Sequence, residues 1–166
     1  MLRWLTLSPG ETYANPPPAV NLRSGLAHFV SESVASMARI CCLAGIDPEK
    51  VALFTALVEA AELSLQTVAE RINVVALGKL APTLLICDID ALEVDQLETL
   101  RQLRFVLPAC VIVVYTTNME RAWSIACHLA GANGLLSKDS SEAELGVGVF
   151  GALRNGCFTD PRFAAA

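Results

Sequence analysis

The chain has 166 residues, of which 54% are hydrophobic and 17% are charged, so it can bury a sizeable core and is not disordered overall. Its richest apolar stretches, Val51–Ala61 and Phe105–Tyr115, are shorter than the roughly 20 residues that a membrane-spanning helix needs. Met1–Gly10 lacks the pattern of a signal peptide. The net charge is −5 and no basic stripe is present, which disfavours direct nucleic-acid binding. We therefore expect a cytoplasmic protein that contacts neither membrane nor nucleic acid through this chain.

The first part of the chain, residues 1–38, differs from the rest and is predicted to be an extension. Pro16–Pro18 cannot continue a helix or a central strand and is typical of a stiff spacer. After it, apolar residues recur at helical spacing and predict an amphipathic helix over Leu22–Met37. Its apolar stripe includes Leu26 and Phe29. We expect this stripe to dock on the rest of the chain or on a second copy of it.

From Arg39 onward, apolar runs alternate with helical patterns. The runs predict strands, and the strands of this alternation are apolar on both faces, which indicates a parallel sheet covered by helices on both sides. We expect an α/β domain over residues 39–160 and a short tail over 161–166. The expected strands lie at Arg39–Leu43, Ser64–Val68, Thr83–Cys87, Cys110–Tyr115 and Gly134–Ser137. The expected helices follow Asp47, then cover Glu70–Leu80, the region of Leu97–Leu103, Met119–Ala130 and Glu142–Arg154.

Polar residues stand where three of these strands end. In a parallel sheet the functional crevice lies beyond the carboxyl ends of the strands, so these side chains are expected to act together. Asp88 offers a carboxylate, Thr116 a hydroxyl and Lys138 an ammonium able to hold a phosphoryl oxygen. This combination suits an acyl-phosphate site.

At these residues the sequence resembles bacterial response-regulator receiver domains, in the branch that usually precedes a LuxR-type helix-turn-helix. The resemblance implies a flavodoxin-like (βα)5 fold with a five-stranded parallel sheet in the order 2-1-3-4-5, here with an N-terminal helical extension. It also implies that Asp88 is the phospho-acceptor position, Thr116 the switch hydroxyl and Lys138 the phosphate-sensing lysine. The segments that carry it are Pro82–Asp88, Leu97–Leu103, Val111–Thr116, Gly131–Asp139 and Asn155–Pro161.

The chain departs from the receiver pattern in two places. Receivers end their first strand with two acidic residues that bind Mg²⁺, whereas the matching positions here are Ala44 and Gly45, or Gly45 and Ile46. Asp47 is better explained as a helix cap, and Asp88 alone would hold Mg²⁺ only weakly. The aromatic residue that receivers place shortly before the lysine is replaced by Leu135-Leu136. These losses favour a degenerate pseudo-receiver with no required cofactor.

The functional hypothesis is therefore a signalling domain without catalytic activity, which acts through protein–protein contacts in a two-component or transcriptional pathway. Two alternatives stay open. In one, the chain is a working receiver that accepts phosphate on Asp88 from a histidine kinase. In the other, it is part of a DNA-binding transcription factor whose helix-turn-helix lies beyond Ala166.

The last predicted helix, Glu142–Arg154, has an apolar middle that one face of a sheet cannot cover entirely. We therefore predict a homodimer through a face that includes Leu145, Val149 and Leu153, with help from the N-terminal segment. Alternatively, the N-terminal helix covers this face within one chain. The run Gly146–Gly151 matches GxGxxG, but it lies inside a helix instead of between a strand and a helix, so it does not indicate dinucleotide binding.

Overall fold

The computed structural model describes residues 39–90, 92 and 95–165. The predicted extension over residues 1–38, with its helix and the docking residues Leu26 and Phe29, lies outside the described residues. The described residues belong to one compact unit, Ala38–Ala166.

The centre of this unit is a parallel sheet with the order β2-β1-β3-β4-β5-β6. The flavodoxin-like fold and the order of the first five strands are as predicted, and the structure adds a sixth strand at the β5 edge. The bounds are β1 Ile40–Ala44, β2 Ser64–Ala69, β3 Leu84–Asp88, β4 Val111–Thr116, β5 Gly134–Ser137 and β6 Phe158–Thr159.

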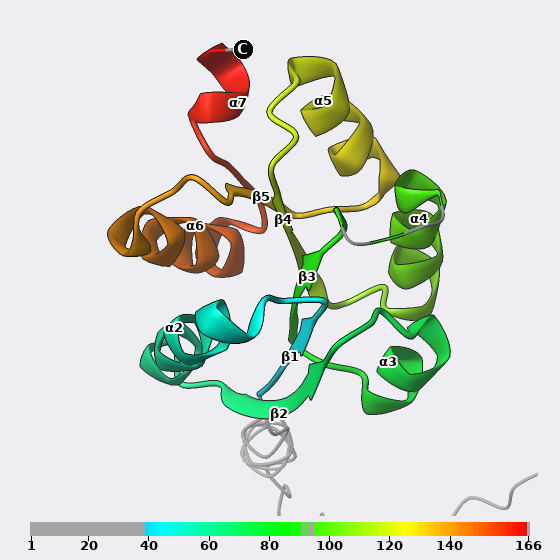
Figure 1. Cartoon of the computed structure of the whole chain (residues 1–166). Helices are drawn as coiled ribbons and strands as arrows, with labels where there is room; N and C mark the ends of the chain where they lie inside the picture. The colour runs from blue at the N-terminus through cyan, green and yellow to red at the C-terminus, as the bar shows by residue number, and fades with distance from the viewer. Residues whose placement is uncertain (1–38, 91, 93–94, 166) are drawn as a thin grey trace, which may run out of the picture. The chain divides into compact units, whose positions relative to one another are not determined.

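Helices cover both faces of the sheet (Figure 1). On one face lie α2 (Pro48–Ala60) and α6 (Glu142–Asn155), and on the other lie α3 (Val74–Leu80), α4 (Gln96–Val106) and α5 (Arg121–Ala130). A short helix, α7 (Arg162–Ala165), ends the described chain. Among the described residues, no helix has both the length and the apolar character needed to cross a membrane.

The helix starts follow from local capping chemistry. Asp47 accepts a hydrogen bond from the Glu49 N–H at 3.0 Å and Pro48 occupies the first turn of α2, so the predicted cap is confirmed. Helix α3 begins later than the predicted Glu70, because the Asn73 side chain accepts from the Ala76 N–H at 3.0 Å and fixes the start there. The first turn of α6 carries a capping box, in which the Ser141 hydroxyl accepts from the Glu144 N–H and the Glu144 carboxylate accepts from the Ser141 N–H.

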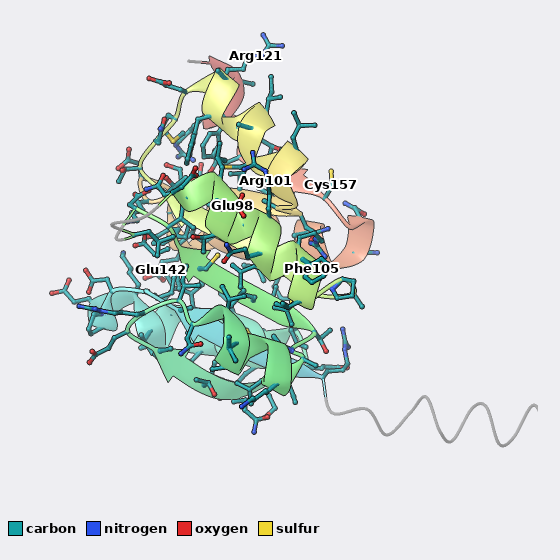
Figure 2. All side chains as sticks on the ribbon, turned by 90° about the vertical axis from the view of Figure 1, so that its right-hand side faces the viewer. Glu98, Arg101, Phe105, Arg121, Glu142 and Cys157 are labelled. Atoms are coloured by element: carbon teal, nitrogen blue, oxygen red, sulfur yellow. The ribbon has the colours of Figure 1, made fainter. Side chains whose placement is uncertain are left out.

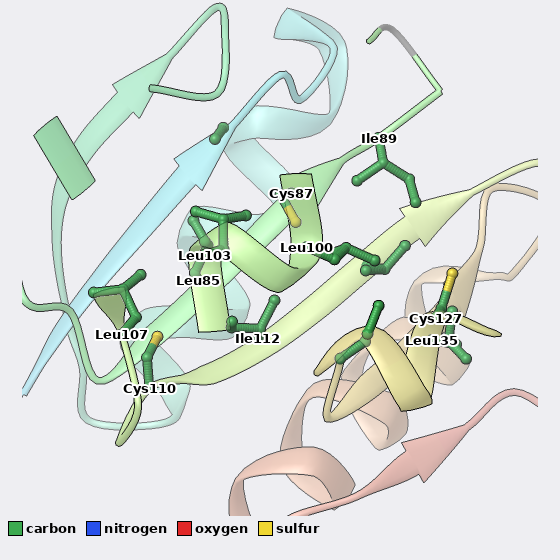
Figure 3. Packing of buried hydrophobic residues seen from close by; sticks show 14 of the residues in the cluster. Leu85, Cys87, Ile89, Leu100, Leu103, Leu107, Cys110, Ile112, Cys127 and Leu135 are labelled. Carbon is green, nitrogen blue, oxygen red and sulfur yellow. The ribbon is translucent and has the colours of Figure 1, made fainter. Parts of the chain in front are cut away.

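The side chains of the central strands point alternately to the two faces of the sheet and pack into two separate cores. On the α3–α4–α5 side, four cysteines pack among leucines and isoleucines as small apolar groups. Cys87, Cys110 and Cys127 are labelled in Figure 3. On the α2–α6 side, Phe54 contacts Tyr115 edge to face, with ring centroids 5.3 Å apart. The outer side of α4 instead presents the exposed pair Glu98 and Arg101 and the 86% exposed Phe105 to solvent (Figure 2).

The C-terminal residues complete this packing. Residues 161–166, predicted to be a tail, include Phe163, which is only 1% exposed and packs into the α3–α4–α5 core. Arg162 holds the segment in place: its guanidinium donates two 2.9 Å hydrogen bonds to the Glu144 carboxylate and contacts Asp160, which also accepts from the Ser140 hydroxyl. The end of the chain thus closes the sheet edge beside β5.

The predicted dimer face on α6 is wrong for two of its three residues. Leu145 and Val149 are 1% and 0% exposed inside the core, and Leu153 is half-buried against the same cluster. A Cβ at Gly148 would lie 2.2 Å from Leu136 Cδ2, so this glycine allows α6 to approach its own sheet. The helix is apolar on several sides because it packs against α2 as well as against β4, β5 and β6 of the sheet.

This packing predicts opposite effects for two glycines of the same helix. Gly148→Ala should lower the free energy of unfolding by about 1–3 kcal/mol, because the new methyl group meets the buried Leu136 and lies 2.9 Å from Phe158 Cε1. Gly146→Ala meets only the end of half-buried Leu57 at 3.2 Å and gains helix propensity, so it should be neutral or stabilising by up to about 1 kcal/mol. Chemical denaturation of both variants measures the difference; equal stability would contradict the packing described.

Candidate functional site

The predicted site residues meet at the carboxyl edge of the sheet. The register pairs Asp88 with Tyr115 and Thr116 with Ser137, so the ends of β3, β4 and β5 lie at the same level. Lys138 follows β5 directly, and its backbone N–H donates to the Thr116 carbonyl at 3.0 Å. Its Nζ lies 2.6 Å from Asp88 Oδ2. The structure therefore brings together the carboxylate, hydroxyl and ammonium that the sequence analysis placed at this edge.

Asp90 is the residue at this edge whose side chain the sequence analysis missed. Its Oδ1 accepts a 2.5 Å hydrogen bond from the Thr116 hydroxyl. Its Oδ2 accepts from the Thr117 N–H at 2.7 Å and from the Thr117 hydroxyl at 2.9 Å, and it lies 3.0 Å from Lys138 Nζ. The signal was present in the sequence, because residues two apart in an extended segment project to the same side.

The charges of the site are mutually stabilised. Burial alone would raise the pKa of Asp90, but hydrogen bonds from Thr116, Thr117 and Lys138 outweigh it and place the pKa below the ordinary 3.8. Burial would lower the pKa of Lys138, but hydrogen bonds and charges from Asp88 and Asp90 outweigh it and place the pKa above 10.5. The Lys138 ammonium also lies 5.8 Å from the centre of the Tyr115 ring. Asp90 and Lys138 thus stabilise one another in their charged forms.

The end of β1 brings no carboxylate to this cluster. Ala44 is fully buried, Gly45 has a φ of +72°, and Ile46 is 5% exposed in the α2–α6 core. A Cβ at position 45 would lie 2.9 Å from the Asp88 carbonyl oxygen, so any side chain there would displace the β3 end. Asp47 is engaged as the cap of α2.

Two leucines of β5 precede Lys138. Leu135 and Leu136, which stand where receivers place an aromatic residue, are both 0% exposed and point into opposite cores. Throughout the described part of the chain, no group of three or more histidine, cysteine, aspartate or glutamate residues is arranged to hold a metal ion. Chemically, the site offers the Asp88 carboxylate, which is ion-paired with Lys138. The neighbouring Thr116 hydroxyl and Asp90 carboxylate are already hydrogen-bonded to each other.

No known protein-family model matches the chain, and no curated protein matches it in sequence. Solved structures do match. The chain is similar to a LuxR-family two-component response regulator from an Aurantimonas species, with a TM-score of 0.61 and 24% identity over 78% of this chain and 94% of that chain.

Two further solved structures are similar. The isolated REC domain of RcsB from Salmonella enterica serovar Typhimurium, in the presence of the phosphomimetic BeF3−, has a TM-score of 0.61 and 20% identity over 76% of this chain and 95% of that chain. A LuxR family DNA-binding response regulator from Silicibacter pomeroyi has a TM-score of 0.56 and 19% identity over 74% of this chain and 97% of that chain. The chain thus has the fold of response-regulator receiver domains.

The ion pair predicts how the acidity of Asp90 depends on Lys138. Lys138→Met should raise the pKa of Asp90, because it removes the ammonium 3.0 Å from Oδ2. Since the native pKa lies below 3.8, Asp90 stabilises the fold above that pH, and this contribution is lost as the pH falls through the native pKa. A carboxyl ¹³C NMR titration measures the shift, with Lys79→Met on exposed α3 as the control. An unchanged Asp90 titration would contradict the described ion pair.

Proposed function

We propose that the chain is a signalling domain of the receiver type that acts through protein–protein contacts and does not require phosphate on Asp88. One observation carries the proposal: Asp90 engages the Thr116 hydroxyl and the Lys138 ammonium that an acyl phosphate on Asp88 would need. The likeness to LuxR-family response regulators supports a role in a two-component or transcriptional pathway. The proposal assigns no catalytic residue and places the protein in the cytoplasm.

The residues at the site fit Mg²⁺ poorly. This ion prefers six oxygen ligands and is usually held by one or two carboxylates together with phosphate. Ala44, Gly45 and Ile46 offer no side-chain oxygen, and the nearest oxygens of Asp88 and Asp90 face Lys138 instead. The proposal therefore includes weak Mg²⁺ binding at most. No step of the proposed function depends on the metal.

Direct phosphorylation tests the proposal. The protein is incubated with acetyl phosphate and Mg²⁺ at millimolar concentration and then analysed by intact mass spectrometry. We expect no mass gain of one phosphoryl group. The lysine that would have to balance the charge developing on the transferring phosphoryl group, Lys138, is already paired with Asp88 and Asp90. Beryllofluoride with Mg²⁺ should likewise leave the Asp88 amide resonance in place.

Phosphorylation of the wild type would instead support the first alternative, a working receiver. A phosphoryl adduct in the wild type that disappears in Asp88→Asn, while Asp139→Asn retains it, would make the chain a working receiver with a histidine kinase as its partner. The second alternative, a transcription factor with a helix-turn-helix beyond Ala166, concerns a region that the sequence does not include.

The proposed protein partners include a second copy of the chain. Because Leu145 and Val149 are buried, the surface of α6 left for a partner centres on Val147, which is 64% exposed, next to Ala143 and Phe150. These residues line a hollow of about 570 Å³. An apolar residue beside a hollow is suited to a protein contact, and we propose it as the dimer face.

Sedimentation equilibrium at micromolar concentrations tests this face. We expect the wild type to dimerise and Val147→Glu to be monomeric. Because Val147 lies at the surface, this variant should unfold like the wild type at concentrations too low for dimerisation. Val149→Glu should instead unfold the domain, since it buries an unpaired charge at a cost of several kcal/mol. A wild type that stays monomeric at every concentration would rule out the dimer.

A further inference from the structure

The side chain of Asp90 is surrounded by donors that belong to other strands. The Thr116 hydroxyl binds one of its oxygens, and the Thr117 N–H, the Thr117 hydroxyl and the Lys138 ammonium bind the other. These donors come from the ends of β4 and β5, whereas Asp90 follows β3. A hydroxyl, a main-chain N–H and an ammonium converging on one anion are the arrangement that holds a phosphate or carboxylate oxygen in proteins.

This anion lies directly beside Asp88. The Asp90 N–H donates to Asp88 Oδ1 at 3.0 Å, and Lys138 Nζ bridges the two carboxylates, at 2.6 Å from Asp88 and 3.0 Å from Asp90. An acyl phosphate on Asp88 would place its oxygens within reach of the same ammonium and of the Thr116 hydroxyl. Two carboxylates already share one cation, so a further dianion at this position would meet net negative charge.

The geometry points to Asp90 as a built-in oxyanion, whose carboxylate occupies the place that a phosphoryl group on Asp88 would take. This inference rests on the proposed function and explains why phosphate on Asp88 is not required. The Thr116 hydroxyl and the Thr117 N–H are directed into the site without phosphate. The segment after β4 is fixed further, because the Asn118 N–H donates to the Thr116 hydroxyl oxygen at 3.1 Å. The Asp90 carboxylate therefore takes the place of an external anion and holds the Thr116 hydroxyl and the Thr117 N–H in the arrangement that binds one.

Removing the Asp90 carboxylate should convert this arrangement into a site for an external anion. We expect the amide resonance of Thr117 in Asp90→Ala to shift saturably when inorganic phosphate is added, with an apparent affinity at least about tenfold above that of the wild type. The double variant Asp90→Ala/Lys138→Met should lose this binding, because the ammonium is then missing.

The matched control is Asp139→Ala. It removes one negative charge at the same edge of the sheet, from a residue whose carboxylate takes no part in the hydrogen bonds and ion pairs of the described residues. It should bind phosphate no better than the wild type. Equal phosphate binding by Asp90→Ala and the wild type, or equal gains in Asp90→Ala and Asp139→Ala, would overturn the inference.

Hydrogen exchange gives a second measurement that needs no ligand. In Asp90→Asn, which keeps the shape of the side chain, the Thr117 amide should exchange about tenfold faster than in the wild type, because a neutral acceptor holds an N–H and an ammonium less strongly. Unchanged exchange would count against the inference. The proposed function has a separate test: phosphorylation of wild-type Asp88 by acetyl phosphate would refute it whatever the Asp90 variants do, whereas failure of the Asp90 variants with an unphosphorylated wild type would refute the inference alone.

Discussion

The ammonium of Lys138 is the cation on which the carboxyl edge of this sheet depends. It lies within ion-pair distance of both Asp88 and Asp90, and it is three-quarters buried, with 25% of its side chain exposed. Two partly buried carboxylates cannot lie side by side without such a cation, because their repulsion would protonate one of them. Once Lys138 is in place, Asp90 can remain ionised and accept the donors of Thr116 and Thr117. The geometry of the segment after β4 follows from this pairing.

The pairing of the strands fixes the positions of these groups at one edge of the sheet. Parallel pairing aligns Asp88 with Tyr115 and Thr116 with Ser137, and the turn after β5 brings Lys138 over the Tyr115 ring. Gly45 allows β1 to end close against the Asp88 carbonyl, where any other residue would collide. The same contact leaves no room for an acidic side chain at position 45. The neighbouring strand therefore supports the site through its backbone alone.

The apolar pattern of helix α6 is explained by the elements that pack against it. Its middle is apolar or glycine, which suggested a partner surface when the helix was considered against one face of a sheet. In the structure the C-terminal residues return as β6 and α7, and Phe158 packs against the helix where the glycines leave space. Arg162 and Phe163 anchor this return at the first turn of α6 and in the opposite core. Among the described residues of α6, Val147 is the large apolar residue that stays exposed.

The sequence by itself determined the fold and most of its elements, because hydrophobic periodicity, the Asp47 cap and the Ser141 capping box are local signals. It also placed Asp88, Thr116 and Lys138 at one edge, since the carboxyl ends of parallel strands must coincide. Only the tertiary structure decided what those residues contact. The pairing of Lys138 with both Asp88 and Asp90, and the bond from Thr116 to Asp90, depend on how the ends of three strands pack together. The sixth strand and the burial of Leu145 and Val149 likewise depend on where the last residues of the chain return, and a return over such a distance leaves no periodic signal in the sequence.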